Sequence, residues 1–140
     1  MMKVLRSKDG FTLVELMVVA IIVAILAAVA IPLMSANKKK AYATEAQAGC
    51  GAVKTALRVY FAENSAYPAS GAASTISGVG AADLDGVYFS TPDYTFTATG
   101  SNIVVLATGN SAASTAPQKA SVAGITVQLN NNGTWTYGGM

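Results

Sequence analysis

Histidine is absent from this chain of 140 residues, and cysteine occurs once, at position 50. Without histidine there is no Ser/His/Asp triad, no Cys/His nucleophile pair and no histidine ligand for zinc, and a single cysteine excludes multi-cysteine zinc sites. The sequence therefore disfavours an enzyme, and we expect no catalytic residue, no metal site and no cofactor. Because Cys50 has no partner for an internal disulfide, we expect it to pack as a small apolar residue.

Charged residues are also sparse, at 11% of the chain, and the formal net charge is only +2. No strongly basic surface indicates nucleic acid, and no acidic tail indicates disorder. Charge therefore does not identify a partner.

One long apolar run is present. From Leu16 to Met34 the chain has nineteen residues without a charge. At about 1.5 Å per residue, a helix of this length nearly crosses a hydrocarbon layer of about 30 Å. The run can hold the chain in a membrane, and roughly a hundred residues remain for one small globular core.

Three ordinary interpretations of the run compete with a more specific one. A secretory signal peptide would use Lys3, Arg6 and Lys8 as its basic start and residues 28–30, Ala-Val-Ala, as its cleavage site. Glu15 disfavours this interpretation, and also an ordinary single-span anchor, because a carboxylate is costly in an apolar segment. A buried helix of a soluble protein is disfavoured because apolar residues cover every face.

The residues from Gly10 to Glu15 read Gly-Phe-Thr-Leu-Val-Glu after a short basic leader. With the uncharged run, Pro32 and an amphipathic helix behind them, they resemble the type IV pilin and pseudopilin signature. The resemblance implies that a prepilin peptidase cuts between Gly10 and Phe11 on the cytoplasmic side and methylates the new amine of Phe11. Residues 1–10 would then be a leader that is absent from the filament. A glycine lets the scissile backbone lie extended in a protease cleft, and the alternative is an ordinary turn glycine.

The same resemblance gives roles to Glu15 and Pro32. Glu15 would pair with the cationic amine of Phe11, in its own chain or, as the family favours, in a neighbouring subunit. A wrong register leaves both charges unpaired, at a cost of several kcal/mol. The alternative for Glu15 is a solvated carboxylate favoured by a helix N-terminus. Pro32 should bend or loosen the helix across residues 28–32, either as a simple kink or as a stretch that opens during filament formation.

A triple lysine, Lys38 to Lys40, follows the run, so the positive-inside rule does not place the N-terminus in the cytoplasm, and the orientation depends on the resemblance. Nucleic acid binding by these lysines with Tyr42, or by Arg58 with Tyr60 and Phe61, is the weaker alternative. Lysines after a span usually lie among lipid headgroups, and aromatic residues on a helical stripe usually belong to a core.

Beyond the lysines, apolar residues recur at spacings of three and four and predict an amphipathic helix to about residue 64. The stripe consists of Ala46, Gly49, Cys50, Val53, Ala56, Leu57, Tyr60 and Phe61. Lys54 and Arg58 lie off the stripe, and we expect both to be solvated. Gly49 and Gly51 each cost about 1 kcal/mol in a helix, which indicates close approach of another backbone or a local bend.

The remaining chain predicts an α+β protein. A loop is expected at residues 65–86, and its Ser-, Gly-, Ala- and Thr-rich part should add little to the core. Strands are expected at residues 94–99, 103–107, 125–129 and 134–137, within a β-sheet region 87–140. Turn residues between neighbours give two hairpins, so a long N-terminal helix, hydrophobic half plus amphipathic half, packs on a small antiparallel sheet of about four strands. The expected parts are a leader (1–10), a membrane and filament-core helix (11–36) and a globular head (37–140).

Many pilins close their C-terminal region with a disulfide, which Cys50 alone cannot form. We therefore expect Trp135 and Tyr137 to anchor the last residues by packing and hydrogen bonds. The segment 83–86, Asp-Leu-Asp-Gly, starts like a calcium loop but lacks further ligands. Some secretion pseudopilins bind calcium near the C-terminus, whereas residues 136–140 offer no carboxylate side chain. The segment 132–134, Asn-Gly-Thr, matches a glycosylation acceptor, a match that is frequent by chance.

Taken together, the sequence predicts a non-enzymatic structural subunit, of the major kind, of a type IV pilus-like filament. Its partners would be copies of itself in a helical homopolymer, the prepilin peptidase and the inner-membrane pilus assembly machinery. It would lie in the bacterial inner membrane as a precursor and in an extracellular surface filament when mature. One alternative is a pseudopilin of a type II secretion system, and another is a membrane-tethered periplasmic binding module. Twitching motility, adhesion and DNA uptake stay open.

Overall fold

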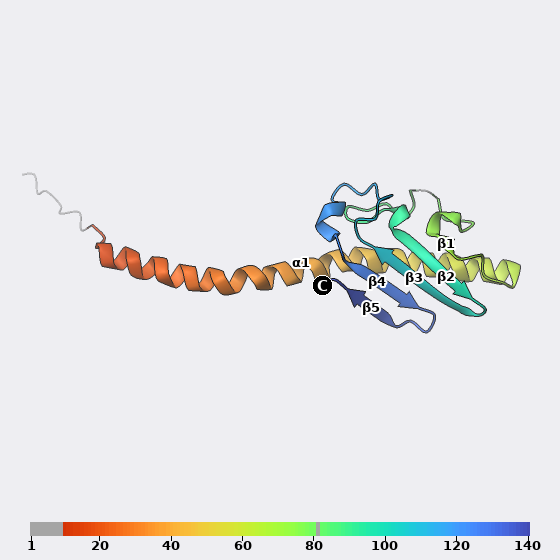
Figure 1. Ribbon diagram of the computed structural model, residues 1–140, viewed down its shortest axis with the longest axis horizontal. Helices are drawn as coiled ribbons and strands as arrows, with labels where there is room; N and C mark the ends of the chain where they lie inside the picture. Colours follow the sequence, from red (N-terminus) through yellow and green to blue (C-terminus); the bar gives the residue numbers. More distant parts are fainter. Residues whose placement is uncertain (1–9, 81) are drawn as a thin grey trace, which may run out of the picture. The chain divides into compact units, whose positions relative to one another are not determined.

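The computed structural model describes residues 10–80 and 82–140. The basic leader residues Lys3, Arg6 and Lys8 lie outside this described part. The chain divides into two compact units, Met1–Ser35 and Ala36–Met140. Helix α1 (Leu13–Asn64) supplies residues to both (Figure 1).

The first unit consists of the apolar part of α1. Its side chains are exposed throughout, from Leu13 at 73% to Met34 at 60%. It contains a stretch long and apolar enough to cross a membrane. The helix continues without a break through Pro32, and both alternatives for this residue, a simple kink and a stretch that opens during filament formation, stay predictions. The carbonyl of Ala28 still loses its usual partner there, because proline has no backbone N–H.

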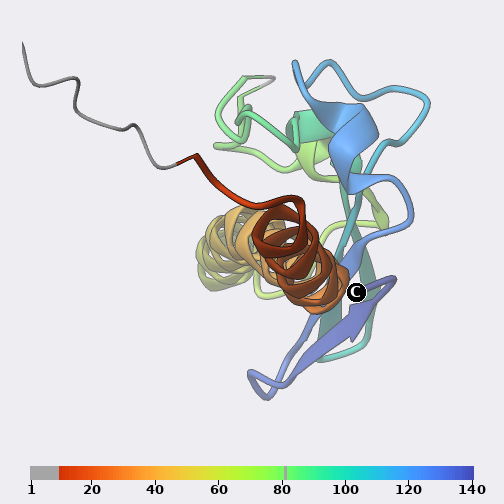
Figure 2. The same cartoon turned by 90° about the vertical axis from the view of Figure 1, so that its left-hand side faces the viewer.

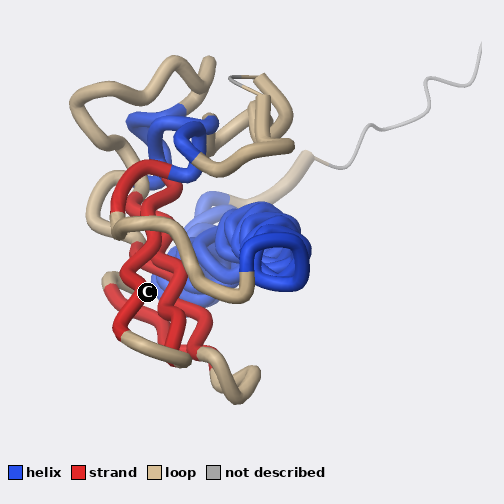
Figure 3. Tube along the Cα trace, turned by 90° about the vertical axis from the view of Figure 1, so that its right-hand side faces the viewer, coloured by secondary structure: helices blue, strands red, loops and turns tan. Residues whose placement is uncertain are grey.

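In the second unit the remainder of α1 lies along one face of an antiparallel sheet of five strands in the order β1-β2-β3-β4-β5 (Figures 1 and 2). The strands are β1 (Gly71–Ala72), β2 (Tyr94–Thr99), β3 (Asn102–Thr108), β4 (Thr126–Asn130) and β5 (Trp135–Gly138). Short 3-10 helices, η1 (Ala73–Thr75), η2 (Thr91–Asp93) and η3 (Lys119–Val122), gather at one end of the sheet (Figure 3). The α+β architecture with a long N-terminal helix is therefore confirmed.

Register follows the alternation of apolar and polar residues. Phe96 lies opposite Val105, Val105 opposite Leu129, and Leu129 opposite Trp135, so one row crosses four strands on the face that meets α1. A shift of one residue would turn this row to solvent, and the pattern therefore fixes the pairing. The four predicted strands are all present, with bounds that differ by one residue at most.

The prediction for the 65–86 loop was partly wrong. Its Gly71–Ala72 pair forms β1, and the Ser70 hydroxyl accepts a hydrogen bond of 2.8 Å from the Ala98 N–H. Ala73 and Ile76 are fully buried, so this segment contributes to the core. The small residues here let the chain run close to the sheet, and one isoleucine among them is enough to attach it.

The helical stripe forms the core as predicted for most of its members. Cys50, Val53 and Leu57 are completely buried against the sheet. Tyr60 and Phe61 are the exceptions, because neither belongs to the core cluster; Phe61 is 38% exposed and packs on Tyr67 with ring centroids 4.7 Å apart. The stripe therefore leaves the sheet one turn earlier than the sequence indicates.

Lys54 contradicts its prediction as a solvated residue, while Arg58 is exposed as expected. Lys54 is only 8% exposed, and its Nζ donates to the carbonyls of Asn130 and Asn131 at 2.8 and 3.0 Å. The first carbonyl belongs to the last residue of β4 and the second to the turn that follows it. The long, flexible lysine side chain extends from α1 to these carbonyls at the edge of the contact between helix and sheet. The periodicity of apolar residues along the helix does not reveal such a contact.

Two buried or half-buried carboxylates tie down the long loops. Glu45 accepts hydrogen bonds from the backbone N–H groups of Tyr88 at 2.9 Å and Phe89 at 2.7 Å. Asp93 is 1% exposed and accepts from the backbone and hydroxyl of Ser90 and from the hydroxyl of Ser114 at 2.6 Å. Hydrogen bonds to ionised acceptors are stronger than neutral ones, so each carboxylate fixes a loop that has no disulfide.

The C-terminus is held more by hydrogen bonds than by burial. Trp135 is half-buried against the core, but Tyr137 is 40% exposed and its hydroxyl accepts from the Gln47 side chain. Lys39 donates to the Gly139 carbonyl at 3.0 Å. Tyr137 is thus an anchor through its hydroxyl rather than its ring.

The two helical glycines differ. A Cβ built on Gly49 would collide with the ring of buried Tyr94, so a side chain, not another backbone, makes the close approach. A Cβ on Gly51 would meet nothing within 4 Å, so the predicted close approach is absent there among the described residues.

This contrast predicts opposite effects of the same substitution. We expect Gly49→Ala to lower the free energy of unfolding by about 1–3 kcal/mol through overpacking against Tyr94. Gly51→Ala, its matched control, should raise it by about 0.5–1 kcal/mol because alanine is the better helix former. Urea unfolding of the full chain in detergent micelles, followed by Trp135 fluorescence, measures both. Equal effects of the two substitutions would contradict the packing at Gly49.

Cys50 packs as the sequence predicts, fully buried with its Sγ 3.8 Å from the Val127 carbonyl. Desolvation by burial raises the pKa of this thiol to about 12, opposed by a backbone hydrogen bond from Ala107. Because the thiolate is the reactive species, the folded protein holds Cys50 in an inert form.

We therefore expect iodoacetamide at neutral pH to alkylate Cys50 at least about 100-fold more slowly in the folded chain than in urea, as measured by intact mass. The raised pKa also links the free energy of unfolding to pH. The contribution of the neutral Cys50 thiol is fully present below its unfolded pKa near 9, and this contribution is lost as the pH rises toward 12. Rapid alkylation of the folded chain, or a disulfide-linked dimer that keeps a native fluorescence spectrum, would contradict the buried position.

Candidate functional site

The predicted processing and assembly residues lie at the start of α1. Thr12 precedes the first helical residue, Leu13, and its backbone N–H donates to Glu15 Oε2 at 2.9 Å. The Thr12 hydroxyl also donates to Oε2 at 2.8 Å, and the Glu15 N–H donates to that hydroxyl at 3.3 Å. This is a capping box, in which the side chains at the N-cap and N3 positions satisfy each other's free backbone donors.

Thr12 was missed by the sequence reasoning, although a signal was present. Thr-x-x-Glu immediately before an apolar run is the pattern of a capping box. Glu15 therefore has a local hydrogen-bond partner before any cleavage. This arrangement resembles the alternative given for Glu15 above, a carboxylate favoured by the helix N-terminus. The hydrogen bonds of its carboxylate within the described residues all use Oε2, which leaves Oε1 for a further donor.

Gly10 and Phe11 precede the helix and are exposed, Phe11 at 85%. A Cβ on Gly10 would meet nothing within 4 Å, and Gly10 is not among the glycines with positive φ. Neither crowding nor backbone conformation in this structure therefore requires glycine at position 10.

The setting of Glu15 is apolar. Phe11, Val14, Leu16 and Val18 border the same shallow hollow on the helix surface as this carboxylate. Exposed apolar side chains then continue on all sides of the helix as far as Met34. Such a surface is stable in a lipid bilayer or against other apolar helices, and it is unstable in water.

The weaker candidate sites in the head are occupied by structural contacts. Asp83 Oδ2 accepts the Gly80 N–H at 2.6 Å and Asp85 Oδ1 accepts the Thr91 N–H at 2.8 Å, so the loop at residues 83–86 does not fit a calcium ligand set. No group of three potential metal-ligating residues occurs in the described ranges.

The aromatic residues beside the basic clusters pack within the head. Tyr42 stacks on Tyr88 with ring centroids 4.3 Å apart, as Phe61 does on Tyr67. Of the three lysines, Lys39 binds the Gly139 carbonyl. Tyr42 and Phe61 therefore have aromatic partners within the head.

Comparison with known proteins connects the start of the chain to a family. The family model described as "Prokaryotic N-terminal methylation motif" matches residues 5–31. Type II secretion system core protein G of Vibrio cholerae is 43% identical over 67 residues, which are 48% of this chain and 46% of that protein. The protein of the same name from Pseudomonas aeruginosa is 40% identical over 65 residues, 46% of each chain.

A fimbrial relative covers more of the chain. Fimbrial protein EcpC of Eikenella corrodens is 35% identical over 103 residues, which are 74% of this chain and 63% of that protein. The chain spans about half the length of the secretion proteins it matches. The methylation motif, the exposed apolar helix and the α+β head agree with one another, and together with these relatives they support a protein of the type IV pilin and pseudopilin family.

Proposed function

We propose that this protein is a non-enzymatic structural subunit of a type IV pilus-like filament, assembled through its N-terminal helix after removal of a leader. The observation that carries the proposal is the match to the methylation motif at residues 5–31, together with a helix from Leu13 whose apolar side chains are exposed as far as Met34. In a filament, residues 11–36 form the helical core and residues 37–140 form the outer heads. Burial of the apolar helices against one another drives the polymer.

Cleavage takes place between Gly10 and Phe11. The absence of any crowding or positive φ at Gly10 supports this role, because a glycine that the fold does not need is explained by access of a protease to the extended backbone. A prepilin peptidase makes the cut and methylates the new amine of Phe11. Residues 1–10 remain behind as the leader.

Glu15 then changes partners. In the precursor its Oε2 accepts from Thr12, and cleavage creates a cation at Phe11 where an uncharged amide stood. Oε1 accepts from the amine of a neighbouring subunit, so that the pair fixes the register between two helices. In apolar surroundings an unpaired carboxylate costs several kcal/mol, and registers that miss the pair are rejected. Pro32 provides a point at which the helix opens, since the Ala28 carbonyl has no helical donor.

The precursor lies in the bacterial inner membrane, held by the apolar part of α1, and the mature subunit lies in a surface filament. Its partners are other copies of the chain, the prepilin peptidase and the inner-membrane pilus assembly machinery. A membrane-tethered periplasmic binding module is the alternative of another class, and in it Glu15 would have no special task.

A pilus subunit is favoured over a type II secretion pseudopilin by two observations. An alignment of 103 residues does not fit within the 64 residues up to the end of α1, so the likeness to the fimbrial protein extends into the head. The matches to the secretion proteins, at 67 and 65 residues, are little longer than that helix.

The first test is the intact mass and N-terminal sequence of the protein recovered from cells and from sheared surface material. We expect a chain that begins at methylated Phe11 and is found in long surface fibres, while Gly10→Val should retain the precursor mass and give no fibres. Cleaved protein confined to the cell envelope would favour a pseudopilin. A chain that begins at Met1 or Ile31 would contradict the proposed processing altogether.

The second test separates two tasks of Glu15. Glu15→Gln keeps the capping box, since glutamine also serves at N3, but it removes the charge. Glu15→Ala removes both. If charge pairing directs assembly, both variants should be cleaved and methylated yet form at least about ten-fold fewer filaments, counted by electron microscopy, because a lost buried pair costs several kcal/mol. Normal filaments from Glu15→Gln would contradict charge pairing and leave helix capping as the role, and normal filaments from both would contradict any role of Glu15 in assembly. A tethered module would form no filaments even from the unmodified chain.

A further inference from the structure

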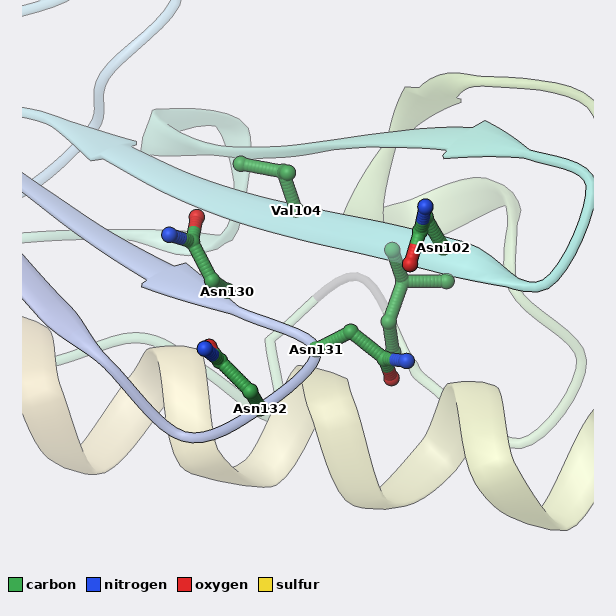
Figure 4. Close-up of a pocket in the computed structure, with 6 residues that line it drawn as sticks. Asn102, Val104, Asn130, Asn131 and Asn132 are labelled. Atoms are coloured by element: carbon green, nitrogen blue, oxygen red, sulfur yellow. The ribbon is translucent and has the colours of Figure 1, made fainter.

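The head carries a polar hollow apart from the apolar helix to which assembly is assigned above. It has a volume of about 400 Å³, within the range of about 300–1,000 Å³ typical of small-molecule sites. Its lining is four asparagines with one valine and one isoleucine: Asn102, Ile103, Val104, Asn130, Asn131 and Asn132. Figure 4 shows that they come from the start of β3, the end of β4 and the turn that follows β4.

Three lining residues lie on the face of the sheet that points away from α1, whereas Ile103 lies on the face toward it. Along β3, Ile103 is buried, whereas Asn102 is exposed and Val104 half-buried on the opposite face. Along β4, Asn130 alternates in the same way with buried Leu129. Val104 and Asn130 lie directly opposite each other in the ladder. An apolar patch from Val104 thus lies among amide side chains.

The walls are held in place by contacts from outside the hollow. Asn131 Nδ2 donates to the Ser101 carbonyl at 3.3 Å, which joins the turn after β4 to the turn before β3. Lys54 donates to the carbonyls of Asn130 and Asn131. Gln128 Nε2 donates to Asn130 Oδ1 at 2.9 Å. The site is preorganised, so a ligand does not have to order the turn when it binds.

Amide groups remain for a ligand. Within residues 10–80 and 82–140, the Asn102 side chain makes no hydrogen bond, and neither does Asn130 Nδ2 or Asn131 Oδ1. Each amide group offers two donors and one acceptor oxygen, and this mixture matches hydroxyl groups, which donate and accept as well.

Charge is missing from the surroundings. From Tyr94 to the end of the chain, Lys119 is the only charged side chain, and no lining residue is charged. Lys54 approaches the turn, but two of its donors are already taken by carbonyls. The site therefore has little to offer a phosphate, sulfate or carboxylate, which proteins bind with arginine, lysine or helix N-termini.

We propose that this hollow binds a neutral oligosaccharide. Its hydroxyl groups exchange hydrogen bonds with the amides of Asn102, Asn130 and Asn131, and the C–H surface of one sugar ring lies on Val104. The subunit thus has a ligand site on the head in addition to its polymerising helix. The binding uses the single unassembled chain, so its failure would leave the filament proposal untouched.

The test is an NMR titration of the full chain, labelled with ¹⁵N, in micelles of a phosphocholine detergent, because sugar-headed detergents would compete. Lactose, cellobiose and N,N′-diacetylchitobiose are the neutral probes, and sialyllactose is the anionic one. We expect at least one neutral probe to give saturable shifts of the side-chain amides of Asn102, Asn130 and Asn131. Asn102→Ala should weaken binding about five- to ten-fold, the effect of one or two lost hydrogen bonds.

Asn37→Ala is the matched control, because Asn37 is exposed on α1 and does not line the hollow, and its affinity should equal that of the unmodified chain. Backbone spectra verify that each variant is folded. The proposal is overturned if none of the three neutral probes gives saturable shifts at these amides, or if Asn102→Ala binds as well as Asn37→Ala. Tighter binding of sialyllactose than of lactose would overturn the assignment to neutral sugars.

Discussion

The close approach of α1 to the sheet is the contact on which the head depends. At Gly49 the helix has no side chain, and the ring of Tyr94 occupies the space that a Cβ would fill. Cys50 and Val53 continue the same contact between helix and sheet, and both are fully buried. Because small residues let the helix lie near β2 to β4, the long Lys54 side chain reaches across to the turn after β4. The same contact thus supports the core and the shape of the polar hollow.

A head without a disulfide needs another way to hold its long connections. The residues between α1 and β2 and between β3 and β4 are irregular, and two carboxylates organise them. Glu45 binds three consecutive backbone N–H groups, those of Val87, Tyr88 and Phe89. Asp93 collects the serine hydroxyls of the other connection. A cross-link acts mainly by restricting the unfolded chain, whereas these carboxylates act only in the folded state, so the loops depend on the core to stay in place.

Periodicity predicted the elements well and the polar contacts poorly. The helical stripe and four strands follow from apolar spacing, because burial against a partner surface is what creates that spacing. β1 was missed because two residues paired at an edge leave no pattern. Lys54 was misassigned because its burial depends on a turn 76 residues away in sequence, to which its Nζ donates. For the candidate site, Gly10, Phe11 and Glu15 were found through a resemblance, while Thr12 was readable from the Thr-x-x-Glu spacing.

The two units of the chain have different physical requirements, and this difference supports separate functions for them. The head buries its own apolar residues, from Ala43 to Leu129, and satisfies its buried polar side-chain groups internally within the described residues. The apolar part of α1 buries nothing, and its side chains need lipid or other helices. Because the surface that needs other helices lies in the first unit and the amide-lined hollow lies in the second, the proposed assembly and the proposed oligosaccharide binding use different residues, and either proposal can fail without the other.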